Sequence, residues 1–544
     1  MLNLKKNTFI IIYLFTLLFV LIYLNNLIPL NLRLNSPHDD GMMVNRANNI
    51  LEGQWLGVYD QFALAKDAGF SIFLSLISLL SISYINAITV ILFVTVLFLV
   101  IAIQKIFNAN FYKMIIVSTP LFFFPTQFIF GYRIIYRDLF IALLIITMIA
   151  GFINLINLIH NWDHVRFCEI KLFANIFIFS ISYSIIFLVR SKTISAHILG
   201  IATILYLLYS YLTRNHINKI VKITSLSVLF FLPSLSIYAV TQINEKSYGV
   251  ALLNDYSYGT FPKAMKEISR LKPIPTTAFI SISRIQREKA YSISPNFNEL
   301  SEIIENPDNS WRDFSCNSLK ICDDFSTGWV YWAIRDAAAQ KGYFNSLIEN
   351  QEFFRQVANE IENYCNSNSS QCSERGVFEL PHVKQLYYTN VMPSFTNNVK
   401  RTLFPENPSY FFTSEDMMYM EYDKFKNHTI WQKVIKTETS STKLKDKWTN
   451  FMKWQRFVDT FSSTIFIWMI IGLTNLRSRN LRSEGIAILP KVILVVIYLS
   501  EIATMTFIES NVWGVMGGNY LLAGNLILWF LGYLGWIQKI NFRN

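Results

Sequence analysis

Charged residues and histidines are scarce in this chain. Asp, Glu, Lys and Arg make up 16% of its 544 residues, against about 25% in ordinary soluble domains. The seven histidines are scattered. Only His160 and His164 are four residues apart, and no HExxH motif is present, so no metal site is indicated. Basic residues exceed acidic ones by 11, but they are dispersed at the ends of apolar runs and form no patch, which argues against a nucleic-acid partner.

Cysteine is also rare, and four of the five cysteines fall in one long polar stretch. They form two close pairs, Cys316 with Cys322 and Cys365 with Cys372. Because this stretch is expected to face outward, we predict a disulfide at each pair, which would stabilise by at most about 2–3 kcal/mol. The alternative is a zinc site built from four cysteines, for which these spacings are too long.

Long apolar runs dominate the rest of the sequence. Hydrophobic residues account for 52% of the chain, and Phe alone occurs 45 times. Runs of about 18 or more residues are long enough to cross a hydrocarbon core of about 30 Å as helix, and lipid offers the backbone no other hydrogen-bond partner. The sequence therefore predicts an all-α polytopic membrane protein with about ten spans, at residues 8–30, 84–107, 114–131, 139–159, 172–189, 194–212, 223–243, 457–475, 488–507 and 519–537.

Two of the apolar regions are irregular. Residues 69–107 are too long for one span and break near Ser81 to Asn86, so 69–81 is expected to be a short interfacial helix. In the span expected at 114–131, Pro120 and Pro125 predict a kink or a break.

The apolar runs divide the chain into three parts. Residues 1–243 form an N-terminal membrane module, 244–455 a mostly helical soluble domain, and 456–544 a C-terminal membrane module. Lys5 and Lys6 precede a first run that is too long for a cleaved signal peptide, so it is expected to remain as an anchor. The loop charges then place both termini in the cytoplasm and the 244–455 domain outside, in a bacterial inner membrane or a plasma membrane.

The first external loop, residues 31–67, carries the candidate chemical centre. His38, Asp39 and Asp40 directly follow the first span and open a short amphipathic helix, which is expected to lie on the membrane surface. One of the two carboxylates can cap that helix. The other carboxylate, with His38 beside it, is left to act as a general base or to bind a cation.

Basic residues at the external ends of the spans form the second part of the predicted site. Positive charge there runs against the orienting bias, so Arg133, Arg137, Arg190 and Lys192 are candidates for binding a phosphate at headgroup depth. Arg133 and Arg137 are four residues apart and are expected to share one helix face. For any one of these residues, the ordinary alternative is snorkelling to lipid headgroups or pairing with Asp138.

These features resemble the GT-C superfamily of integral membrane glycosyltransferases. The resemblance rests on the motif His38-Asp39-Asp40-Gly41, the stretch 48–57 and Tyr59, in the first outer loop of a polytopic protein with a large external domain. It covers about residues 1–243 and, more loosely, the last three spans. It implies a sugar donor carried on a polyprenyl phosphate or diphosphate, and transfer to a lipid, glycan or protein acceptor on the outer face.

The resemblance also implies roles for particular residues. Asp39 or Asp40 would be the catalytic base and Asp138 a second acid, while His38 and the four basic residues would bind substrate. It leaves a divalent metal ion open as a cofactor. One feature departs from the family, because several members carry an Arg-Tyr pair before a late span, where this chain has Asn519-Tyr520 without an arginine.

Two other functions are compatible with the sequence. One is a non-enzymatic transporter or flippase of lipid-linked precursors, which is expected to carry ionisable residues inside its spans. The span interiors of this chain nearly lack such residues. The other is a membrane-anchored binding protein that acts through the 244–455 domain.

Overall fold

A computed structural model describes most of the chain. The described residues are 2–31, 38–107, 110–129, 132–162, 167–213, 217–275, 279–374, 388–403, 429–430, 433–434, 464–476, 488–509 and 518–540. Within them every regular element is a helix, apart from one isolated bridge between Leu271 and Cys372. The predicted all-α fold is confirmed for this part of the chain.

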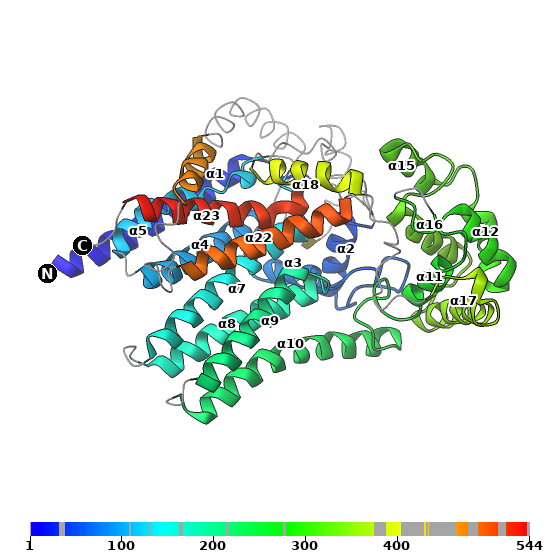
Figure 1. Cartoon of the computed structure of the whole chain (residues 1–544), viewed down its shortest axis with the longest axis horizontal. Coiled ribbons are helices and arrows are strands. Elements are labelled where there is room, and N and C mark those ends of the chain that lie inside the picture. The colour runs from blue at the N-terminus through cyan, green and yellow to red at the C-terminus, as the bar shows by residue number, and fades with distance from the viewer. Residues whose placement is uncertain are drawn as a thin grey trace.

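Seven of the described helices are long and apolar enough to cross a membrane. They lie along the long axis of the molecule (Figure 1) and are α1 (Leu2–Leu27), α4 (Tyr84–Phe107), α7 (Arg137–His160), α8 (Cys168–Val189), α9 (Ile194–Thr213), α10 (Lys219–Tyr248) and α22 (Leu489–Ile508). The chain is therefore a multi-pass membrane protein. The expected count of about ten spans is not confirmed.

The other three expected spans are short or broken. The described part of the expected span 114–131 contains α5 (Phe111–Val117), α6 (Thr119–Phe122) and the 3-10 turn η1 (Pro125–Gln127) instead of one helix, because proline removes a backbone donor. The expected span 457–475 is described as an apolar helix only over Thr464–Thr474, and its residues 457–463 lie outside the described part. The last expected span is α23 (Leu522–Ile540), whose apolar part is Leu522–Ile537.

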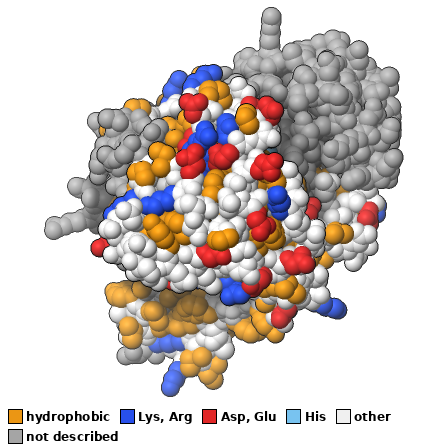
Figure 2. All heavy atoms as spheres, turned by 90° about the vertical axis from the view of Figure 1, so that its right-hand side faces the viewer, with side chains coloured by type: hydrophobic (Ala, Val, Ile, Leu, Met, Phe, Trp, Pro, Cys, Tyr) orange, Lys and Arg blue, Asp and Glu red, His pale blue; other side chains and the backbone are white. Residues whose placement is uncertain are grey.

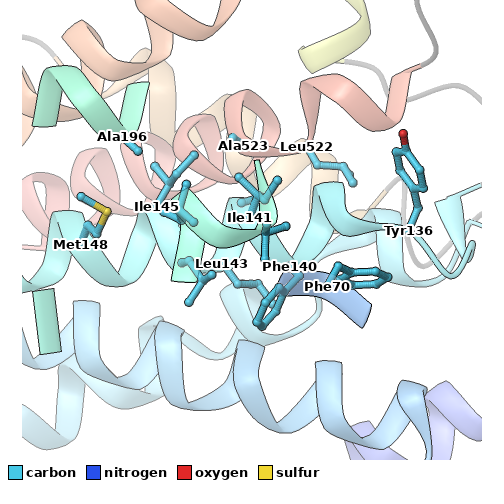
Figure 3. Packing of buried hydrophobic residues seen from close by; sticks show 14 of the residues in the cluster. Phe70, Tyr136, Phe140, Ile141, Leu143, Ile145, Met148, Ala196, Leu522 and Ala523 are labelled. Atoms are coloured by element: carbon cyan, nitrogen blue, oxygen red, sulfur yellow. The ribbon is translucent and has the colours of Figure 1, made fainter. Parts of the chain in front are cut away.

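α7 is the central helix of the membrane bundle. Most of its side chains are buried, and it contacts α4, α8, α9, α22 and α23. Figure 3 shows Ile141 and Ile145 of α7 in the same packed region as Ala196 of α9 and Ala523 of α23. Because α7 begins at Arg137, its first turn carries a charged pair, Arg137 and Asp138, at the edge of this apolar core.

The region between α1 and α4 differs in part from expectation. The break predicted within 69–107 is confirmed, since α3 (Gly69–Leu79) ends before α4 begins. α2 (Asp40–Leu51) was expected on the membrane surface, but its first two turns are buried and it packs against α3. Met43 and Ala47 of α2 accept hydrogen bonds from Ser71 and Ser75 of α3 through their carbonyls, both at 3.0 Å.

A helical domain follows α10 at the end of the molecule opposite the start of α1 (Figure 1). Its helices are α11 (Thr260–Ser269), α12 (Arg284–Ile293), α13 (Pro295–Asn298), α14 (Ser301–Ile304), α15 (Ser310–Leu319), α16 (Thr327–Gln340) and α17 (Leu347–Ser367). Both predicted disulfides are present, Cys316–Cys322 and Cys365–Cys372. Figure 2 shows acidic and basic side chains interspersed over this end of the molecule, with a more hydrophobic surface below.

One helix of the predicted 244–455 domain packs elsewhere. α18 (Tyr388–Leu403) lies against α22 and α23, and its Arg401 Nη1 is 2.9 Å from Glu509 Oε1 at the end of α22. Residues 375–387 and most of 404–455 lie outside the described part. The α11–α17 segment is thus the part of the predicted soluble domain that forms the helical end of the molecule.

A buried ion pair ties this helical end to the first loop. Arg335 of α16 is fully buried and lies 3.0 Å from Asp255. It donates two hydrogen bonds, at 3.2 and 2.6 Å, to the carbonyl of Gln61, while the Tyr59 hydroxyl donates to Asp255 at 2.6 Å. Because an unpaired buried charge is very unfavourable, this network holds α16 in a fixed position over the first loop.

Candidate functional site

A cavity of about 560 Å³ lies between the membrane bundle and α16. Its walls come from the residues before α2, the loop before α3, the first turns of α7 and α9, the α8–α9 loop, the end of α22, the start of α23 and the face of α16. Six of the residues predicted for the site line it, namely His38, Asp39, Arg137, Asp138, Arg190 and Lys192. Segments far apart in the sequence therefore build one hollow.

Asp39 is held by two residues that the sequence did not single out. The ammonium of Lys66, from the loop before α3, donates to Asp39 Oδ1, and the Tyr136 hydroxyl donates to the same oxygen at 3.2 Å. Burial lowers the pKa of Lys66 to about 8, although Asp39 opposes that shift. Burial, helped by the charge of Asp39, raises the pKa of Tyr136 well above its usual value, so the phenol keeps the proton that it donates.

A second ion pair lies deeper in the cavity. Arg190, the residue that ends α8, pairs with Asp138 in the first turn of α7. Burial disfavours the charged guanidinium, but Asp138 and two tyrosines outweigh this effect and raise the pKa of Arg190. The guanidinium also lies over the ring of Tyr520, 5.6 Å from the centroid, in a cation–π arrangement.

Arg137 and Lys192, the other two predicted cations of the cavity, make fewer interactions with the rest of the protein. Arg137 donates to the carbonyl of Val189 at 3.2 Å and lies 5.7 Å from the Tyr136 ring centroid, and its buried Nε has no hydrogen-bond partner among the described residues. Lys192 is exposed at the cavity edge. Both therefore retain donors for an anion that enters the cavity.

The backbone that carries these cations is fixed by Asp67. Its Oδ2 accepts from the backbone N–H of Ser191 at 2.8 Å, and its Oδ1 accepts from the side chain of Asn254. One buried carboxylate thus joins the α8–α9 loop, the first loop and the segment after α10. This holds Arg190 and Lys192, the neighbours of Ser191, beside the first loop.

His38 faces an aromatic wall on the helical end of the molecule. Its ring lies 5.3, 5.9 and 5.6 Å from the rings of Trp311, Trp329 and Trp332. On its other side, His38 Nε2 is 3.8 Å from Asp39 Oδ2. His38 therefore stands between the carboxylate and the tryptophans.

The part of the cavity between α7 and α22 is largely apolar and contains one acid. Ile141 and Ile145 of α7 line it together with Met505 and Ile508 of α22. Glu501 of α22 also lines it, is only 8% exposed, and interacts electrostatically with Arg190. A buried carboxylate on a membrane-spanning helix is unfavourable and usually functional. The sequence contained this signal, because Glu501 interrupts an apolar run.

The other two predicted site residues lie outside the cavity. Asp40 begins α2, is 1% exposed and does not line the hollow. The expected capping of α2 by a carboxylate is not observed at Asp39, which occupies the N-cap position without a side-chain capping bond. Asp39 is therefore the acid of the pair that faces the cavity.

Arg133 has a different role from the one expected. It precedes α7 in an irregular segment, so it does not share a helix face with Arg137. Its buried guanidinium donates to the carbonyls of Asn25, Ile28 and Pro29 at 2.6, 2.9 and 3.0 Å, and it also bonds Gln127. The carbonyls of Asn25, Ile28 and Pro29 lie at and just after the end of α1, where they lack helical hydrogen-bond donors.

Comparisons with known proteins add no identification. No protein family model, curated protein or solved structure matches this chain. Among the described residues, no cluster of three or more His, Cys, Asp or Glu side chains is arranged to hold a metal ion. The cavity and its residues are therefore the basis for assigning a function.

Proposed function

We propose that the chain is a membrane glycosyltransferase that moves a sugar from a polyprenyl phosphate or diphosphate donor to an acceptor hydroxyl. The observation that supports this proposal most strongly is that a carboxylate, Asp39, shares one cavity with Arg137, Arg190 and Lys192. A transferase of this kind needs a base for the acceptor and positive charge for the departing phosphate. The GT-C resemblance of the first loop points to the same class.

Asp39 and the three cations would have different roles in the reaction. Asp39 removes the proton of the acceptor hydroxyl while the acceptor oxygen bonds to the anomeric carbon of the sugar. The bond from that carbon to the phosphate oxygen breaks, and its electron pair leaves with the phosphate. Arg137, Arg190 and Lys192 stabilise the resulting anion, so no acid is needed to protonate the leaving group.

The shape of the cavity suits a donor with a lipid tail. The cations lie near the ends of α7 and α8, and the hollow continues between Ile141 and Ile145 of α7 and Met505 and Ile508 of α22. A phosphate placed at the cations would direct an attached isoprenoid chain toward these apolar side chains. Burial of such a chain contributes about 0.8 kcal/mol per CH₂ group.

Glu501 favours a second candidate, a transporter or flippase of lipid-linked precursors. Transporters commonly place ionisable residues on helices inside the membrane, beside their substrate sites. Glu501 of α22 has that position and lines the cavity. This candidate predicts movement of intact donor across the membrane without bond cleavage.

Transfer in isolated membranes tests the proposal. Membranes containing the protein are supplied with radiolabelled polyprenyl-phosphate and polyprenyl-diphosphate sugars, and label is counted in the lipid, glycan and protein fractions. Asp39→Asn should reduce transfer by about 10²–10⁴ at unchanged protein abundance. Asp60→Asn is the matched control, because Asp60 is an exposed acid of the same loop outside the cavity.

Two results would contradict this assignment. Full transfer by Asp39→Asn would eliminate Asp39 as the base. Movement of intact labelled donor between leaflets, unaffected by Asp39→Asn but lost in Glu501→Gln, would favour the transporter.

A further inference from the structure

The cavity wall opposite the cations is aromatic. Trp311 of α15 and Trp329 and Trp332 of α16 form a tryptophan wall, in which Trp311 stacks on Trp329 at 5.3 Å and on Trp332 at 6.1 Å between ring centroids. Trp329 and Trp332 line the cavity, and Trp329 is only half-buried. Trp329 is therefore the member of the wall that offers accessible ring surface to the hollow.

The wall is fixed relative to the first loop. On the α15 side, the Trp311 indole N–H donates to Asp336 of α16 at 2.6 Å, and the Cys316–Cys322 disulfide holds the end of that helix. On the α16 side, Arg335 donates to the carbonyl of Gln61 in the first loop. Such a rigid surface can orient a bound group without losing side-chain freedom.

Contacts between neighbouring side chains give the order of groups across the cavity. His38 contacts the tryptophan wall, and its Nε2 is 3.8 Å from Asp39. Asp39 accepts from Tyr136, whose ring lies against Arg137 and Tyr520, and Tyr520 lies against Arg190. The carboxylate thus lies between the tryptophans on one side and the cations on the other.

We infer that the tryptophan wall binds a pyranose ring of a carbohydrate acceptor; this inference rests on the proposed transferase function. The face of a pyranose ring that carries C–H groups stacks on an indole, while its hydroxyls point outward at the ring edge. The hydroxyls can then meet polar groups of the same cavity, such as Ser257 and Asn254. One hydroxyl at the edge nearest His38 would lie on the side of Asp39.

The position of the wall favours a glycan over a lipid or a peptide. The apolar side chains suited to a lipid tail come from α7 and α22, whereas the wall belongs to α15 and α16 outside the membrane bundle. One common mode of binding an extended peptide uses backbone hydrogen bonds to a strand edge, and the described residues contain no strand. Flat aromatic faces with a few polar groups at their edge are what a sugar ring needs.

Saturation-transfer difference NMR on the purified full chain in detergent micelles tests the inference without turnover. The probes are neutral oligosaccharides of glucose, galactose, mannose and N-acetylglucosamine, with short serine- and threonine-containing peptides as the competing class. The wild type and Asp39→Asn should both show saturation transfer to saccharide ring protons. Trp329→Ala should weaken saccharide binding at least about tenfold, and Trp329→Phe should weaken it less.

Ile285→Ala is the control variant, because Ile285 is an exposed side chain of the same helical end, away from the cavity. It should bind saccharides as the wild type does. Equal saccharide signals from the wild type and Trp329→Ala, no signal from any saccharide, or signals from the peptides alone would each overturn the inference. If saccharides bind through Trp329 but Asp39→Asn retains full transfer, the proposed base fails and the acceptor site stands.

Discussion

Asp39 and Lys66 form an ion pair inside the cavity, although they are 27 residues apart in the chain. Each belongs to a different end of the first loop, and α2 lies between them. Tyr136 joins the pair from the segment before α7. The carboxylate proposed as the base is therefore held in place by Lys66, whose charged ammonium form is disfavoured by burial.

The first prediction concerns the pH dependence of anion binding. Because burial lowers the pKa of Lys66 from 10.5 to about 8, its ammonium is charged below that pH and becomes neutral as the pH rises through it. Loss of this positive charge should weaken binding of a polyprenyl diphosphate roughly tenfold between pH 7 and pH 9. Binding to the protein in nanodiscs at low salt, measured at several pH values, checks this.

Lys66→Arg is the control for this prediction. An arginine keeps its charge throughout this range, so the decrease in affinity above pH 8 should disappear. A similar decrease in Lys66→Arg would show that another group is responsible.

The sequence was sufficient for features that depend on short stretches of chain. Apolar runs predicted the seven membrane-length helices, and two close cysteine pairs predicted both disulfides. The interruption of 114–131 also followed from local chemistry, because Pro120 and Pro125 cannot continue a helix's hydrogen bonds. None of these predictions required knowledge of which segments meet in space.

Features that depend on long-range packing were not predictable in this way. The partnership of Lys66 with Asp39 and the tryptophan wall are formed by segments that periodicity does not relate. In the sequence, Arg133 has the position expected of a headgroup-binding arginine. In the structure, its side chain is buried and donates hydrogen bonds to carbonyls at the end of α1, which lack helical donors. Glu501 is the exception, since a lone acid in an apolar run could have been singled out from the sequence.

The second prediction separates a structural cation from a substrate-binding one. Arg133→Met should leave buried carbonyls of Asn25, Ile28 and Pro29 without their donor, and should destabilise the protein by at least about 3 kcal/mol. Lys192→Met should instead affect donor binding and not stability, because Lys192 is exposed at the cavity edge. It should raise the donor KM several-fold and leave stability unchanged.

Thermal unfolding of the purified variants, together with donor KM in the folded fraction, measures both effects. A normal melting temperature with a raised donor KM in Arg133→Met would restore the original hypothesis that this residue contacts the substrate.

The third prediction concerns the helical end that carries the tryptophan wall. Arg287 of α12 is fully buried and binds Glu305 through two hydrogen bonds of 2.7 and 3.0 Å and Asp324 through one of 2.7 Å. Arg287→Met would leave Asp324 without its cation, while Glu305 would keep Arg312 at 3.3 Å, so we expect a loss of about 3 kcal/mol of stability. On the same helix, Arg284 is exposed, and Arg284→Met removes its pair with Glu288 and a longer contact of 3.9 Å with Glu305. It should change stability by less than about 1 kcal/mol.

Limited proteolysis of the full chain, with cleavage followed at the α11–α17 segment, compares the two variants. Equal protection of Arg287→Met and Arg284→Met would show that the buried cluster does not stabilise this part of the molecule.

The last prediction uses Glu501 to distinguish the transferase from the transporter. In the transferase, Asp39 removes the acceptor proton. Glu501 lines the same cavity and interacts electrostatically with Arg190, so an ionised Glu501 would repel a donor phosphate there. Glu501→Gln should therefore lower the donor KM a few-fold through loss of that repulsion, whereas Glu501→Asp, which keeps the charge, should not. Transfer assays at varied donor concentration measure this. A transporter that uses Glu501 as its coupling group would instead lose activity in Glu501→Gln, because a neutral amide cannot take up or release a proton.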